Sequence, residues 1–122
     1  MNPHKKIQRT PYFSIDILSY IYYILIVYEI ETTEEFDAWL HNLRDVSMRG
    51  FIAKRITIMS SGSLGETRSL GGGLFEAKIS RGPGYRLYFV NKGSRIIVLL
   101  CGGDKSTQDR DIKRAKELAK EL

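Results

Sequence analysis

The chain contains 122 residues, of which 43% are hydrophobic and 27% charged, and its formal net charge is +5. This length and composition are typical of a single soluble domain with a substantial core. The lone cysteine, Cys101, excludes an internal disulfide and a metal site built from several cysteines, and it fits a reducing, cytoplasmic setting. His4 and His41 lack metal-ligand spacing, so no metal or cofactor is expected. The basic charge suits an anionic partner such as nucleic acid.

The first 22 residues differ in character from the rest of the chain. Lys5, Lys6 and Arg9 precede an apolar run from Ile17 to Tyr28. As a helix, that run is too short to span a bilayer, and no small-x-small cleavage site follows it. We interpret residues 1–22 as an N-terminal extension and residues 23–122 as the working domain. An extra strand or helix packed on that domain and a membrane or export role are the alternatives.

A strand followed by a helix is predicted after this extension. Apolar and polar residues alternate towards the end of the segment from Leu25 to Glu31, which favours a strand. Thr32 and Glu35 have the spacing of a capping box, so a helix is expected to begin there. Apolar residues then recur at helical spacing and predict one buried stripe, made up of Phe36, Trp39, Leu40 and Leu43.

Asp45 is expected to cap a second helix, which extends from Val46 to about Met59. The apolar face of this helix contains Met48, Ile52, Ile56 and Met59. Lys54 and Arg55 lie elsewhere on the helix, where cations either form a solvated face or contact phosphate groups.

The segment from Leu74 to Asp104 predicts three strands, the first two joined by the turn Gly82-Pro83-Gly84. Alternation places two sets of side chains on one core face, namely Phe75, Ala77 and Ile79, then Tyr85, Leu87 and Phe89. A three-residue loop keeps these sets matched, because it pairs Ile79 with Leu87 and Lys78 with Tyr88. The third strand, Ile96 to Leu100, is apolar without alternation, which indicates a central strand buried on both faces.

The opposite face of the first two strands is expected to be exposed. It carries Lys78, Arg86 and Tyr88, together with Glu76, which we interpret as a salt-bridge partner. An exposed face of this kind suits RNA, because cations contact phosphates and aromatic rings stack on unpaired bases.

Two further segments lie on either side of these strands. Before them, Ser60 to Gly73 is rich in glycine and predicts a loop, without the GxxxxGK[ST] pattern of nucleotide-hydrolysing proteins. After them, Ser106 and Asp109 have capping-box spacing and predict a C-terminal helix that ends at Leu122. The apolar face of that helix contains Ile112, Ala115, Ala119 and Leu122.

From about Ile24 onward the chain resembles the RelE/ParE superfamily of bacterial toxins, and most of all the addiction-module killer proteins related to HigB. The resemblance rests on FDAWLHNLRD (36–45), the basic second helix, GPGYRLYFV (82–90) and LLCGGDKSTQDRDI (99–112). It implies a small α+β fold, with a twisted antiparallel sheet, two N-terminal helices on one face and a C-terminal helix.

The resemblance also implies an activity. RelE-like toxins cut mRNA, usually in the ribosomal decoding site, with the RNA 2′-hydroxyl as nucleophile and without a metal. Such a reaction needs cations aimed at the charge that develops on the phosphate oxygens. Arg86 matches the arginine that the family keeps on this strand and is assigned to the scissile phosphate. Lys78 approximately matches a family lysine and is expected to act as base or phosphate clamp. Lys105 matches a position that is often basic in the family and is expected to interact with the leaving oxygen.

Further RNA contacts are expected from Arg81, Tyr88, Lys54 and Arg55, with Tyr88 stacking on a base or relaying a proton. A toxin of this kind implies a neutralising antitoxin, expected to be a helix-turn-helix protein. The mRNA and the ribosome are the other expected partners, and no membrane is expected. A DNA gyrase poison of the ParE type and an inactive, decayed module are the alternatives to a ribonuclease.

Overall fold

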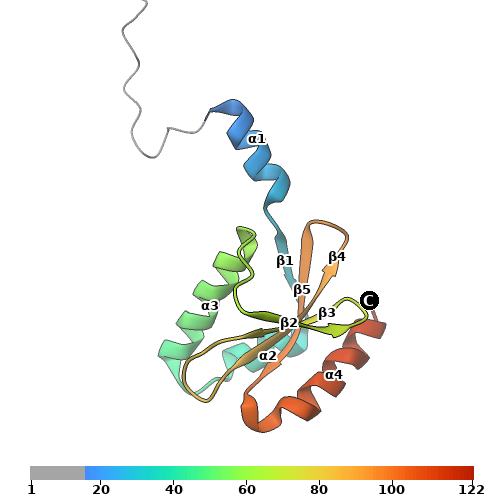
Figure 1. Ribbon diagram of the computed structural model, residues 1–122. Coiled ribbons are helices and arrows are strands. Elements are labelled where there is room, and N and C mark those ends of the chain that lie inside the picture. Colours follow the sequence, from blue (N-terminus) through green and yellow to red (C-terminus); the bar gives the residue numbers. More distant parts are fainter. Residues whose placement is uncertain (1–15) are drawn as a thin grey trace, which may run out of the picture.

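A five-stranded sheet lies at the centre of the domain (Figure 1). The structure, a computed structural model, describes residues 16–122, and of residues 22–26 it describes the backbone alone. Neighbouring strands follow the order β1-β5-β4-β3-β2, in which β1 is parallel to β5 and the other pairs are antiparallel. The strands are β1 (Glu29–Thr32), β2 (Thr67–Gly71), β3 (Leu74–Lys78), β4 (Arg86–Lys92) and β5 (Ile96–Gly103).

Two helices, α2 (Glu34–His41) and α3 (Val46–Ser60), pack on one face of the sheet. Trp39 packs against the apolar cluster on this face, as its helical spacing predicts. The cluster joins both helices to the inward side chains of the sheet and includes Phe36, Met48, Ile52, Met59, Ala77, Leu87 and Phe89. The predicted α+β fold, with two N-terminal helices on one face, is confirmed, but the sheet is mixed instead of wholly antiparallel because β1 is parallel to β5.

Short polar side chains cap both of these helices. The Asp45 carboxylate accepts hydrogen bonds from backbone N–H groups in the first turn of α3, as predicted. In α2 the capping residue is Thr33 instead of the predicted Thr32, and its hydroxyl accepts a hydrogen bond from the N–H of Phe36. The same hydroxyl donates to the carbonyl of Leu100 in β5. This contact with a distant strand explains why the cap lies one residue later than the local pattern indicates.

The other face of the sheet is covered by α4 (Gln108–Lys120), so the prediction that this face is exposed is wrong. Ala115 and Leu118 of α4 pack with Tyr88 of β4 in a second apolar cluster. The buried stripe of α4 also differs from the predicted one, because Leu118 is buried whereas Leu122 is exposed. The sheet therefore has a core on both sides, whereas its edge strands β1 and β2 stay largely exposed.

The hairpin between β3 and β4 has a longer loop than predicted, residues 80–84. Lys78 pairs with Arg86, and Ala77 pairs with Leu87, which shifts the register by two residues from the prediction. Because side chains alternate with a period of two, this shift leaves each side chain on its predicted face of the sheet. Its main consequence is that Lys78 lies directly opposite Arg86.

Three other elements differ from the prediction. No strand begins at Leu25, because helix α1 (Ile17–Ile26) extends through that position and projects away from β1 (Figure 1). The last part of the predicted glycine-rich loop forms the edge strand β2. A 3₁₀ turn, Lys105–Thr107, precedes α4, and Asp104 caps it in place of the predicted Ser106. The three cations that precede α1 in the sequence lie outside the described residues.

Two consecutive glycines, Gly102 and Gly103, end β5 where a side chain would not fit. A Cβ on Gly102 would lie 2.4 Å from the ring of Trp39, and a Cβ on Gly103 would lie 1.8 Å from a carboxylate oxygen of Asp111. Both distances are far shorter than carbon contacts in folded proteins. The end of β5 can therefore meet α2 on one face and α4 on the other only because both residues are glycine.

Gly102→Ala is expected to lower the free energy of unfolding by about 1–3 kcal/mol, the usual cost of overfilling a packed core. Urea unfolding followed by tryptophan fluorescence measures the change, since Trp39 is the group that would be displaced. Gly50→Ala is the matched control, because this glycine lies inside α3 with nothing within 4 Å of the new methyl group. It should stabilise the protein by about 0.5–1 kcal/mol through helix propensity. Equal effects of the two substitutions would contradict the packing argument.

Candidate active site

A hollow of about 400 Å³, which we call the basic hollow, opens where β3 ends and β4 begins. Four of its lining residues are cations and none is acidic, so it attracts anions. All three predicted catalytic residues belong to it. Its lining is Lys78, Ser80, Arg81, Gly82, Pro83, Gly84, Arg86 and Lys105.

Strand pairing and one backbone contact bring these cations together. Lys78 and Arg86 are direct partners across β3 and β4. Like charges at such a position destabilise a sheet, by up to about 1 kcal/mol, and a bound anion would remove this cost. The backbone N–H of Lys105 donates to the carbonyl of Pro83 at 3.4 Å, which ties the hairpin loop to the turn before α4.

The Arg86 guanidinium is held on several sides. Its side chain is 7% exposed, and its Nη1 donates a 2.6 Å hydrogen bond to the carbonyl of Gly84. Its Nε lies 3.8 Å from a carboxylate oxygen of Glu76 and makes no hydrogen bond to any described residue. Gly84 has a φ of +76°, and a Cβ there would lie 3.1 Å from Nη1, so the loop needs glycine at this point. The charge is therefore in place before a ligand binds, which is the condition for strong electrostatic stabilisation.

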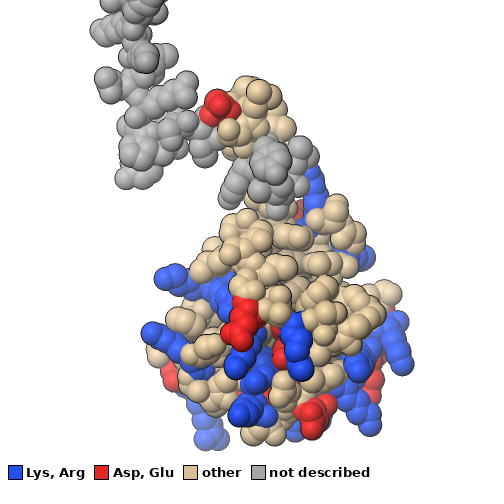
Figure 2. Space-filling model, in the orientation of Figure 1, with Lys and Arg blue, Asp and Glu red and all other residues tan. Residues whose placement is uncertain are grey.

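The remaining cations of the basic hollow are more accessible. Lys78 is partly buried, whereas Arg81 and Lys105 are exposed. The Arg81 guanidinium lies 4.6 Å from the centre of the Phe51 ring, a cation–π contact that holds its side chain near the loop. Lys and Arg side chains surround the end of the domain opposite α1, with some acidic side chains among them (Figure 2). The basic hollow combines one fixed cation with three that can adjust to a ligand.

Tyr88 does not face this hollow, and its predicted stacking on an RNA base is wrong. The side chain is fully buried beneath α4. Burial raises the pKa of the phenol well above its usual value, and the negative charge of Glu76 raises it further. The phenol therefore stays protonated at physiological pH and lies out of reach of a ligand, which also argues against a proton relay.

Arg55 and Lys54 also lie outside the basic hollow. The Nη1 of Arg55 donates to the carbonyl of Lys78 at 3.0 Å, and its Nη2 donates to the carbonyl of Leu64 at 2.9 Å. These bonds join α3 to β3 and to the loop before β2, so the structural role of Arg55 contradicts the predicted phosphate contact. Lys54 is exposed on α3, and its contact with RNA stays a prediction.

Glu76 is a salt-bridge partner, as predicted, and it pairs with both Arg86 and Arg68. Gln108, which no sequence pattern singles out, donates from Nε2 to the Glu76 carboxylate at 3.0 Å. Gln108 is the first residue of α4 and Glu76 lies in the middle of β3. Only the packing of α4 on the sheet brings the two residues together, so local sequence carried no signal for this contact.

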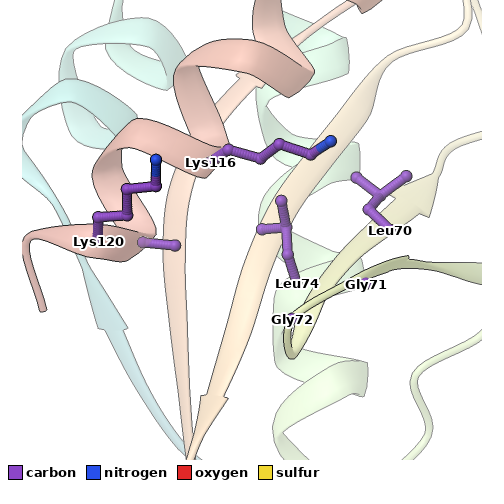
Figure 3. A pocket seen from close by; sticks show the side chains of 7 residues that line it. Leu70, Gly71, Gly72, Leu74, Lys116 and Lys120 are labelled. Atoms are coloured by element: carbon purple, nitrogen blue, oxygen red, sulfur yellow. The ribbon is translucent and has the colours of Figure 1, made fainter.

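A separate groove of about 520 Å³ lies between the C-terminal half of α4 and the β2–β3 turn (Figure 3). Its lining is largely apolar, with Leu70, Leu74 and Ala119, and the Lys116 side chain extends towards the two leucines (Figure 3). The lining contains no carboxylate, hydroxyl, thiol or imidazole group. The basic hollow, with its converging cations, is therefore the better candidate for an active site.

Two features are absent from residues 16–122. No group of three or more His, Cys, Asp and Glu side chains is arranged to hold a metal ion in that part of the chain. No helix there is long and apolar enough to cross a bilayer.

Comparison with solved structures identifies the fold. One chain of the toxin–antitoxin complex RelBE2 from Mycobacterium tuberculosis matches this chain with a TM-score of 0.52 and 21% sequence identity. The match covers 66% of this chain and 100% of the other. The fold is therefore RelE-like, in agreement with the α+β fold that the sequence predicts.

Comparison with known sequences identifies the family. An uncharacterised protein of Haemophilus influenzae is 47% identical over 94 residues, which are 77% of this chain and 95% of the relative. The chain belongs to the same family as this Haemophilus influenzae protein. No family model matches the chain.

Cys101 is expected to be unreactive in the folded protein. The residue is buried beneath α4, and burial raises the pKa of its thiol to about 12, with smaller contributions from the Asp111 and Glu35 carboxylates. The reactive thiolate is therefore scarce until the pH approaches that value. We expect a thiol reagent such as dithiobis(nitrobenzoate) to label the protein at about pH 8 only after denaturation in guanidinium chloride. Labelling of the folded protein as fast as free glutathione would contradict the burial of this thiol.

Proposed function

We propose that this protein is the toxin of a type II toxin–antitoxin pair and that it cleaves mRNA in the basic hollow. The observation that carries the proposal is the convergence of Lys78, Arg86 and Lys105 on one concave site, from three separate segments of the chain. The RelE-like fold supports it, because the similar Mycobacterium tuberculosis chain comes from a toxin–antitoxin complex. We also propose that the protein belongs to the HigB-like branch, on the motifs GPGYR and LLCGGDKSTQ.

In the proposed reaction the 2′-oxygen of a ribose attacks the adjacent phosphorus. A 2′,3′-cyclic phosphate forms, the bond between phosphorus and the 5′-oxygen of the next nucleotide breaks, and the 2′-hydroxyl proton passes to water. The Lys105 ammonium donates a proton to the leaving 5′-oxygen and regains one from water. Arg86 binds two non-bridging oxygens with its planar guanidinium, and Lys78 neutralises the extra negative charge of the transition state.

The fixed position of Arg86 is central to this mechanism. Its Nη1 is held by the Gly84 carbonyl, and its Nε faces the Glu76 carboxylate, so the guanidinium needs little rearrangement when charge develops on the phosphate. Lys78 and Lys105 approach from the neighbouring strand and from the turn before α4. A phosphate bound between the three would have cations on its oxygens at the start and at the end of the displacement.

The proposal includes protein and RNA partners. The similar Mycobacterium tuberculosis chain comes from a toxin–antitoxin complex, and we propose a corresponding antitoxin for this chain, a helix-turn-helix protein. We further propose that cleavage takes place on ribosome-bound mRNA in the cytoplasm. The exposed cations of the basic hollow, Arg81 and Lys105, suit that setting, since ribosomal RNA presents many phosphates.

Arg86→Ala is expected to reduce RNA cleavage about 10²- to 10³-fold, the usual effect of removing one preorganised donor from an active site. Lys105→Ala should also reduce it, and it tests the site with little risk to the fold because Lys105 is exposed. The measurement is the mapping of RNA ends after incubation with purified protein, with and without ribosomes. Growth of cells that express each variant gives a second readout.

Lys92→Ala is the matched control for both variants. Lys92 is exposed at the other end of β4, about 20 Å from Arg86 at roughly 3.3 Å per strand residue. The Lys92→Ala variant should cleave RNA and arrest growth like the unsubstituted protein. Thermal unfolding of each variant checks that the fold is intact. Full cleavage by a folded Arg86→Ala variant would refute the assignment of the site. Growth arrest with DNA damage and without RNA cuts would support a gyrase poison instead.

Binding of single-stranded RNA is expected to weaken steeply with salt, because phosphate contacts release counterions. Lys105→Ala should make the slope of log K against log salt concentration less steep by about 0.7–1, the share of one phosphate contact. Lys92→Ala should leave the slope unchanged. Fluorescence anisotropy of a short labelled RNA measures the RNA affinity of the unsubstituted protein and of both variants at several salt concentrations. An affinity that does not depend on salt would exclude the proposed phosphate contacts.

A further inference from the structure

A second concave site, of about 280 Å³, adjoins the basic hollow on the side of β2, and we call it the side hollow. The two share Lys78 and Arg86. The rest of the lining comes from β2 with the residue before it, from β3 and from the start of α4: Glu66, Thr67, Arg68, Glu76 and Gln108. A group bound in the side hollow would therefore lie next to a phosphate bound by Arg86.

The charge of the side hollow differs from that of the basic hollow. Two carboxylates, of Glu66 and Glu76, accompany the three cations in its lining. A second phosphate would meet these carboxylates at close range, which disfavours it. An uncharged polar group would meet both hydrogen-bond donors and acceptors without this repulsion. The lining thus suits a neutral, polar part of the same ligand.

The polar groups of the side hollow are held in a fixed arrangement around Glu76. This residue is 5% exposed, and its carboxylate accepts a 3.0 Å hydrogen bond from Gln108 and lies 3.2 Å from Nη2 of Arg68. A buried carboxylate is stable only with such partners, so the three side chains constrain one another. Their arrangement exists before a ligand binds, and this lowers the entropic cost of binding.

Donors remain for a ligand after these contacts are made. The guanidinium of Arg68 has five N–H donors, its side chain is 58% exposed, and Glu76 engages one of its ends. An arginine guanidinium is planar and can donate to two neighbouring acceptors on a base edge, as in guanine O6 and N7.

We propose that the side hollow is a nucleobase subsite, which holds the base of a nucleotide adjacent to the scissile phosphate, and that its donors favour guanine. The proposal rests on the proposed function, since the phosphate itself occupies the basic hollow. Arg68 contacts the acceptor edge of the base, and Gln108 is a positioning residue that holds Glu76 and, through it, Arg68. The ribonuclease would then prefer to cut next to guanine.

Isothermal titration calorimetry with inorganic phosphate and with guanosine 3′- and 5′-monophosphate tests this subsite without relying on cleavage. At least one of the nucleotides is expected to bind about tenfold more tightly than phosphate, the contribution of one good base contact. Arg68→Ala and Gln108→Ala should each remove most of that advantage while phosphate binding is retained. Lys113→Ala, an exposed α4 residue outside both hollows, should behave like the unsubstituted protein.

The possible outcomes separate the two proposals. If both guanosine monophosphates bind no more tightly than inorganic phosphate, the nucleobase subsite is refuted while the phosphate site stands. If the advantage of the nucleotide survives in folded Arg68→Ala and Gln108→Ala variants, the base lies elsewhere and the subsite is refuted too. If inorganic phosphate itself fails to bind the unsubstituted protein at low salt, the proposed function loses its basis.

Discussion

The ion pair between Glu76 and Arg86 is the interaction on which the site depends. Both side chains are largely buried, where a lone charge would be strongly unfavourable, so each requires the other to stay in place. Arg68 and Gln108 complete the environment of Glu76, and the Gly84 carbonyl completes that of Arg86. A guanidinium is thereby held at the edge of a positively charged hollow. An exposed arginine would instead spread over many rotamers and lose entropy on binding.

The helix α4 determines how much of the sheet remains available for function. It covers the face that carries Tyr88, and it begins beside Glu76, so the end of that face beyond the helix stays open. Gly102 and Gly103 allow the chain to turn from β5 into this helix in close contact with both neighbouring layers. The Asp104 cap then starts the turn that carries Lys105, next to the hairpin loop. The packing of α4 thus both hides the middle of the face and supplies one cation to its open end.

The comparison of Lys78, Arg86 and Tyr88 shows where sequence reasoning succeeds and where it fails. Strand alternation correctly placed all three on the same face, and a register error of two residues did not alter this, because the side-chain period is two. Alternation does not say whether a face is covered. Tyr88 lies beneath α4, whereas Lys78 and Arg86 line the basic hollow, and that difference depends on where a distant helix packs. Arg55 shows the same limit, since its partners are backbone carbonyls from remote segments.

By itself, the sequence determined the local elements: the two helices on either side of Asp45, the three strands after Leu74, and the two sides of the first two of these strands. These depend on caps, turns and periodicity, which act over a few residues. Only the tertiary structure decided that Lys105 joins Lys78 and Arg86 in one hollow and that Gln108 reaches Glu76. Those neighbours are set by the packing of α4 against the sheet, and packing joins residues that no spacing along the chain relates.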